Sequence, residues 1–165
     1  MVYNDWRDLT HQNAYAPYPL KIEQIENLFK DFTYNTNRPY DERIALKIKE
    51  IDNSAFVMYW LKDVVTYITY ENVRPWTLYN DLKTLKDRNI YEGVIKSDYD
   101  FRGGDIIFLS DHNNFTDQIQ DAYYIGVWLW DKFLAFDING LQTKSFTDFL
   151  NEYPDVYTNM SVFRI

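Results

Sequence analysis

The chain of 165 residues has a length that fits one domain, and its 46% content of apolar residues is enough to fill a hydrophobic core. It contains no cysteine, which excludes disulfide bonds, thiolate catalysis and thiolate metal sites. The net charge is −8 and no basic cluster is present to neutralise phosphates, so the composition argues against nucleic-acid binding. Aromatic residues make up 19% of the chain, led by 15 tyrosines, and this favours a tyrosine-rich core, an interface or a sugar-binding surface.

Metal-binding and targeting signals are also missing from the sequence. The two histidines, His11 and His112, are too far apart to form a recognised metal motif, so we expect no metal and no cofactor. No apolar run reaches the length of a membrane span, and the N-terminus lacks a basic stretch followed by an apolar one. We therefore expect the chain to act in the cytoplasm of the cell that makes it, or to leave that cell by lysis or within a larger particle such as a virion.

The first half of the chain predicts helices. Residues 1–20 show little periodicity and are rich in aromatic residues, as an irregular arm would be. Apolar side chains at helical spacing then predict an amphipathic helix, with Ile22, Ile25, Leu28, Phe29 and Phe32 on one face. A polar loop over 33–39 precedes a second helix, which Asp41 is expected to cap. The predicted apolar face of this second helix is Ile44, Ile48 and Ile51.

A third, largely apolar helix follows over residues 52–70. Either Asp52 or Ser54 is suited to cap it, because a short polar side chain accepts a hydrogen bond from the unpaired amides of the first turn. A helix that is apolar on most of its circumference belongs in a core. Pro75 marks a break, and a further helix is predicted from the spacing of Leu78, Leu82 and Leu85.

The second half of the chain predicts strands. The expected strands cover residues 90–95, 105–109, 122–130, 133–138 and 156–165, with turns at Gly103-Gly104 and Asn139-Gly140. Ser145 and Asp148 resemble a capping box for a short helix that ends before Pro154. Helices followed by antiparallel strands indicate an α+β domain in which N-terminal helices pack on a C-terminal antiparallel sheet.

Four local strings occur in a characteristic order: Asp52-Asn53-Ser54-Ala55-Phe56-Val57, Gly104-Asp105-Ile106-Ile107-Phe108-Leu109, Tyr124-Ile125-Gly126-Val127-Trp128-Leu129 and Lys132-Phe133-Leu134-Ala135-Phe136. In this order they resemble the NlpC-type cell-wall peptidases, papain-like hydrolases of peptidoglycan that are related to the CHAP amidases. The closing segment 161–165 also looks like the last strand of that family. The resemblance covers residues 41–165 and implies a papain-like domain, to which residues 1–40 add the aromatic arm and an extra helix within one globular unit.

The resemblance also implies that the catalytic residues have been replaced. The family's cysteine nucleophile corresponds to Asn53, whose amide is no nucleophile at neutral pH. The family's histidine base corresponds to Tyr124, and the residue that orients the histidine corresponds to Ala135. We therefore expect a protein that is not an enzyme.

A few other residues are candidates for chemistry or binding. Ser54 with His112 is the obvious substitute pair, but Ser54 lies about 100° of helical turn past the nucleophile position. Asp105 could be a catalytic carboxylate, although an aspartate that bonds its own backbone after a glycine turn is the more ordinary interpretation. Trp128 and Trp130, predicted to share one face of their strand, and Tyr123 beside them are candidate sugar-binding residues.

The preferred hypothesis is a structural or assembly component, most simply of a phage virion or tail, that binds other protein subunits in a homo- or hetero-oligomer. The first alternative is a catalytically inactive module that binds peptidoglycan. Two further alternatives are a hydrolase that uses unrecognised residues such as Ser54, and an acidic inhibitor that mimics nucleic acid.

Overall fold

The computed structural model describes residues 21–38, 41–61, 74–85, 87–111, 123–154 and 156–164. The arm over 1–20, the second part of the long central helix, and the loop with His112 are predictions that lie outside these residues. In chain order the elements are α1 (Ile22–Phe29), β1 (Thr33–Tyr34), α2 (Glu42–Ile48), β2 (Glu50–Ile51), α3 (Asn53–Leu61), α4 (Pro75–Lys83), β3 (Asn89–Val94), β4 (Ile106–Ser110), β5 (Tyr123–Leu129), β6 (Lys132–Asp137), β7 (Gly140–Lys144), α5 (Phe146–Glu152) and β8 (Asn159–Phe163).

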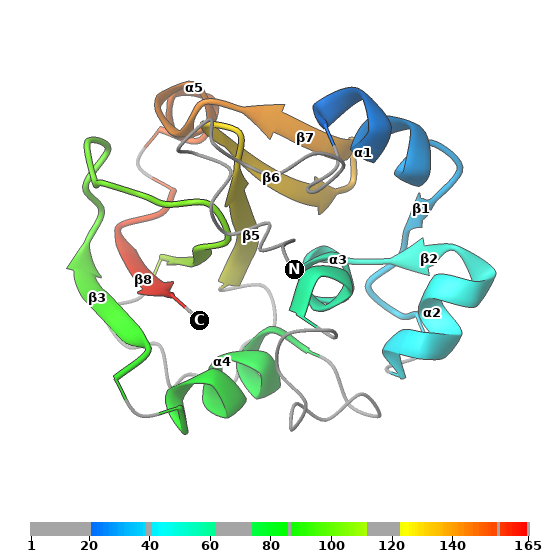
Figure 1. Ribbon diagram of the computed structural model, residues 1–165, viewed down its shortest axis with the longest axis horizontal. Helices are drawn as coiled ribbons and strands as arrows, with labels where there is room; N and C mark the ends of the chain where they lie inside the picture. The colour runs from blue at the N-terminus through cyan, green and yellow to red at the C-terminus, as the bar shows by residue number, and fades with distance from the viewer. Residues whose placement is uncertain are drawn as a thin grey trace, which may run out of the picture.

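A six-stranded antiparallel sheet forms the centre of the molecule, in the order β3-β8-β4-β5-β6-β7 (Figure 1). The central strands β8, β4 and β6 are almost entirely buried, which is typical of strands that are covered on both faces. A parallel pair of two-residue strands, β1 and β2, lies apart from this sheet, beside α2. The α+β class predicted from the sequence is confirmed.

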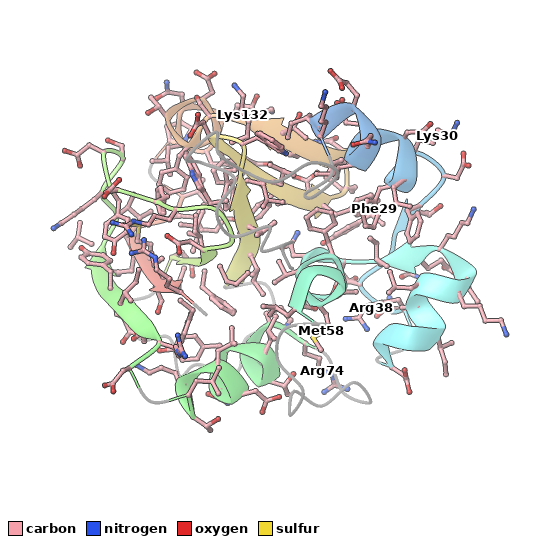
Figure 2. The ribbon with its side chains drawn as sticks, viewed as in Figure 1. Phe29, Lys30, Arg38, Met58, Arg74 and Lys132 are labelled. Carbon is pink, nitrogen blue, oxygen red and sulfur yellow. The ribbon has the colours of Figure 1, made fainter. Side chains whose placement is uncertain are left out.

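The two faces of the sheet have separate hydrophobic cores. On the first face, α1, α3 and α4 pack over alternate residues of the strands, such as Phe108, Val127 and Phe136. Phe29 points from α1 toward α3 (Figure 2), and its ring lies 5.0 Å from the ring of Phe56. On the second face, the intervening strand residues pack against α5 and the segment before β4. We call these the helix face and the α5 face of the sheet.

Most of the predicted elements are confirmed, because local signals specify them. Pro75 is the first residue of α4, where its missing N–H costs no hydrogen bond. Ser145 caps α5, since its Oγ accepts a hydrogen bond from the amide of Asp148. The turn at Asn139-Gly140 is also present, with Gly140 at φ 85°. The sequence did not predict β1, β2 or β7.

The predicted apolar face of α2 is wrong. Ile44 and Ile48 are 50% and 45% exposed, whereas Ala45 is fully buried. The helix turns its small residue toward α3, which lets the two backbones approach closely, and the larger isoleucines consequently face solvent. Ile51 is buried as predicted, but it belongs to β2 rather than to the helix.

Candidate functional site

Asp52 organises the N-terminus of α3, the position where the resemblance places a nucleophile. Its Oδ1 accepts a hydrogen bond from the amide of Ala55, 2.9 Å away, and so caps the helix as one of the two predicted caps. Arg38 donates to the same oxygen through Nε at 3.1 Å and Nη2 at 3.0 Å. Both side chains are buried, and Figure 2 shows Arg38 between α2 and α3. The N-terminus of α3 is therefore held by a buried ion pair.

Asn53 is the first residue of α3, and its side chain is used to fasten the helix to the sheet. Its Nδ2 donates a hydrogen bond of 2.6 Å to the backbone oxygen of Phe136 in β6. This bond joins residues that are 83 positions apart in the sequence. The amide thus makes a structural contact at the nucleophile position.

Tyr124, at the predicted position of the base, is buried on the α5 face. Its hydroxyl donates a hydrogen bond of 2.7 Å to Oδ2 of Asp137, and its ring lies 4.8 Å from the ring of Phe149. Burial, and then the neighbouring Asp137 carboxylate, raise the pKa of Tyr124 above its ordinary value. The hydroxyl therefore stays protonated at neutral pH and acts as a hydrogen-bond donor.

Asp137 is a buried polar residue that sequence reasoning missed. It accepts from Tyr124 and also from the amide of Asn139, at 2.8 Å, in the turn before β7. The sequence does hold a signal for this contact, because an aspartate side chain in a turn often accepts a hydrogen bond from the backbone amide two residues later. The resemblance to the family instead pointed to Ala135, which is fully buried and pairs with Gln142 of β7.

The three predicted catalytic positions are used in structural contacts. Tyr124 and Ala135 belong to the core on the α5 face, whereas α3, which begins with Asn53, packs on the helix face. Asn53 and Tyr124 reach neighbouring residues at the same end of β6, Phe136 and Asp137. Each of the two side chains is therefore engaged in a contact with β6.

Ser54 and Asp105, the other candidates for chemistry, are both enclosed in structural contacts. The hydroxyl of Ser54 donates to Oδ1 of Asp52 at 2.8 Å and accepts from Nη2 of Arg38 at 3.1 Å. Its proposed partner His112 lies outside the described residues. The carboxylate of Asp105 receives two hydrogen bonds from Arg164, at 2.8 and 2.7 Å, and one from the amide of Arg102.

The paired tryptophan platform predicted from strand alternation is wrong. Trp128 packs on the α5 face, 4.9 Å from the ring of Phe101, while Trp130 packs against the core of the helix face. The reason is that β5 ends at Leu129, and Trp130 and Asp131 form a two-residue turn with φ of 54° and 58°. The alternation of side chains along β5 stops at this turn, so the two indole rings lie on opposite faces of the sheet. Tyr123 begins β5, and its side chain lies outside the description.

In the part of the chain that the structure describes, no group of three or more aspartate, glutamate or histidine side chains is placed to hold a metal ion. None of the described helices combines the length and the apolar character that crossing a membrane requires.

The sequence matches no model of a known protein family, and no curated protein matches it either.

Proposed function

We propose that this chain is a non-catalytic domain of the papain-like, NlpC type that serves as a structural or assembly component, in a phage virion or tail. The observation that carries this proposal is the use of the former catalytic positions for structure. Asn53 fastens α3 to β6, Tyr124 fastens β5 to the end of β6, and Ala135 is fully buried within β6.

The chemistry of these contacts supports the absence of catalysis. A nucleophile must be exposed to its substrate and close to a base that accepts its proton. Asn53 has no proton to lose at neutral pH, and the raised pKa of Tyr124 keeps its hydroxyl protonated, so it cannot take up a proton as a base would. Among the described residues, the buried Ser54 hydroxyl is bonded to Arg38 and Asp52.

The domain type is supported by sequence order and by the position of one helix. The string from Asp52 to Val57 begins α3, and α3 packs against β5 and β6, the strands that carry the third and fourth strings of the resemblance. Its partners under this proposal are other protein subunits, in the cytoplasm of the producing cell or in the assembled particle.

The peptidoglycan-binding alternative has less support. It was based on an aromatic platform of Trp128 and Trp130, and these side chains lie on opposite faces of the sheet. The ring of Trp128 is packed against Phe101, and its Nε1 is buried.

A muropeptide assay tests the proposal. We expect the wild-type chain to leave muropeptides uncleaved, because Asn53 is no nucleophile and the protonated hydroxyl of Tyr124 cannot act as a base. Product release is measured by liquid chromatography, with an active cysteine cell-wall hydrolase assayed in parallel.

Turnover by the wild-type chain that disappears in Ser54→Ala would contradict the proposal, because it would establish an enzyme with a serine nucleophile. Mass spectrometry of particles purified from the producing cells should in addition find the chain together with other subunits.

A further inference from the structure

The exposed side of α2 combines apolar and basic side chains. Ile44 and Ile48 lie one helical turn apart and are about half exposed, and Lys47 and Lys49 are exposed beside them. Neither lysine forms an ion pair with a described residue, although the chain as a whole is acidic. We call Ile44, Lys47, Ile48 and Lys49 the α2 surface.

The charges of the α2 surface restrict the kind of partner that it fits. Two copies of this surface would bring four lysines together, and like charges placed face to face oppose association. A partner that buries the two isoleucines must therefore offer apolar groups within an acidic surrounding. The contact is consequently between unlike surfaces.

A surface of this kind lies on the same chain, at α5 and the residues that follow it. Asp148 and Glu152 are exposed on α5, and Val156 is 45% exposed just beyond the helix. Tyr153 and Tyr157 are half-buried between them. We call these five residues the α5 surface.

The two tyrosines of the α5 surface are partly buried close to acidic side chains. Burial, and then Tyr153, Asp111 and Asp137, raise the pKa of Tyr157 to about 12. Burial, and then Asp137 and Glu152, likewise raise the pKa of Tyr153. Lys144, which is paired with Glu152, lowers the pKa of Tyr153. Acidic, aromatic and aliphatic groups thus gather on one surface that complements the α2 surface.

The two surfaces lie on different sides of the molecule, with α2 at the right and α5 at the upper left of Figure 1. We propose that the chain associates head to tail, with the α2 surface of one copy docked on the α5 surface of the next. This inference rests on the proposed assembly function and names its partner as a second copy of the chain. A contact between unlike surfaces leaves one of each free at the ends, so it generates rings or filaments rather than closed dimers.

Two single variants, each blocking one surface, test the proposal in sedimentation velocity experiments on the full chain. Ile48→Glu places a carboxylate against the acidic α5 surface, and Val156→Lys places an ammonium group against Lys47 and Lys49. We expect the wild-type chain to form concentration-dependent oligomers that weaken with salt, and each variant to weaken association by about tenfold or more.

Mixing the two variants gives the sharpest result. The Ile48→Glu chain keeps an intact α5 surface and the Val156→Lys chain keeps an intact α2 surface, so the mixture should form 1:1 dimers and nothing larger. Lys30→Glu and Val94→Lys change a matched charge and a matched exposed valine elsewhere, and both should associate as the wild type does.

Three outcomes would overturn the inference: a wild-type chain that is monomeric at its highest soluble concentration, oligomers that neither variant weakens, or a mixture that does not recover dimers. A monomeric chain that is nevertheless found with other subunits in native particles would end this inference and leave the proposed function standing. A chain that associates and also cleaves muropeptides would contradict the proposed function and leave this inference standing.

Discussion

At the scale of single residues, the ion pair between Arg38 and Asp52 decides how α3 begins. Asp52 uses one oxygen to cap the helix, to accept from Ser54 and to receive two bonds from Arg38. Burying both charges offsets most of the gain from their attraction, so the pair contributes little net stability. Removing one partner is different, because the other charge is then left buried without compensation.

Arg38→Ala should therefore lower the free energy of unfolding by about 3–5 kcal/mol. Urea denaturation followed by circular dichroism measures the change. Arg102→Ala removes an arginine from an exposed position and should change stability by less than about 0.5 kcal/mol. Equal losses in the two variants would show that the buried pair has no special role.

At the scale of elements, the hairpin of β5 and β6 depends on a glycine in the middle of β5. A Cβ atom on Gly126 would lie 2.5 Å from the backbone oxygen of Leu134 and 2.5 Å from the ring of Phe133. The phenyl ring covers the glycine, so the hairpin gains buried area where β5 has no side chain. The neighbouring backbone belongs to the central strand β6, and displacing it would cost free energy.

Gly126→Ala should cost about 1–3 kcal/mol, because the added methyl group overpacks a site closed by backbone. Thermal or urea denaturation would detect the loss. Gly93→Ala is the matched control, since its Cβ would meet only the hydroxyl end of Tyr91, at 3.1 Å, and that side chain is able to shift. If the Gly93 variant loses as much as the Gly126 variant, the close approach of β6 is not the cause.

At the scale of the whole molecule, a cluster of tyrosines makes the stability of the fold depend on pH in the alkaline range. Tyr124 and Tyr157 lie with Phe149 and Tyr153 on the α5 face, and burial beside acidic groups raises the pKa values of all three tyrosines. A group whose pKa is raised by folding keeps its proton longer in the folded chain than in the unfolded one. Its stabilising contribution is complete below a pH of about 10, the ordinary tyrosine value, and is lost as pH rises through the folded value.

For Tyr157 this window runs from pH 10 to about 12. The free energy of unfolding should fall steeply over this range in the wild-type chain and less steeply in Tyr157→Phe. Urea denaturation at closely spaced pH values measures both curves, and lysine titration cancels in their difference. Near neutral pH the two curves should run parallel. A difference that stays constant up to the top of the window would mean that Tyr157 ionises in the folded chain as freely as in the unfolded one.

The sequence by itself determined those features that depend on neighbouring residues and on composition. Apolar spacing specified α1 and α4, Ser145 specified the start of α5, and apolar runs specified β4, β5 and β6, because helix and strand periodicity are local properties. The absence of cysteine rules out a thiolate nucleophile whatever the fold, since composition does not depend on how the chain packs.

Only the tertiary structure decided which side of each element faces the core. The burial of Ala45 instead of Ile44 depends on how closely α2 approaches α3, and the opposite directions of Trp128 and Trp130 depend on where β5 ends. The partners of Asn53 and Tyr124 are tertiary contacts that no local pattern specifies: Asn53 bonds a residue 83 positions away. Spacing along the chain predicts which residues share a strand, but the packing of α3 and α5 on opposite faces determines which of them meet.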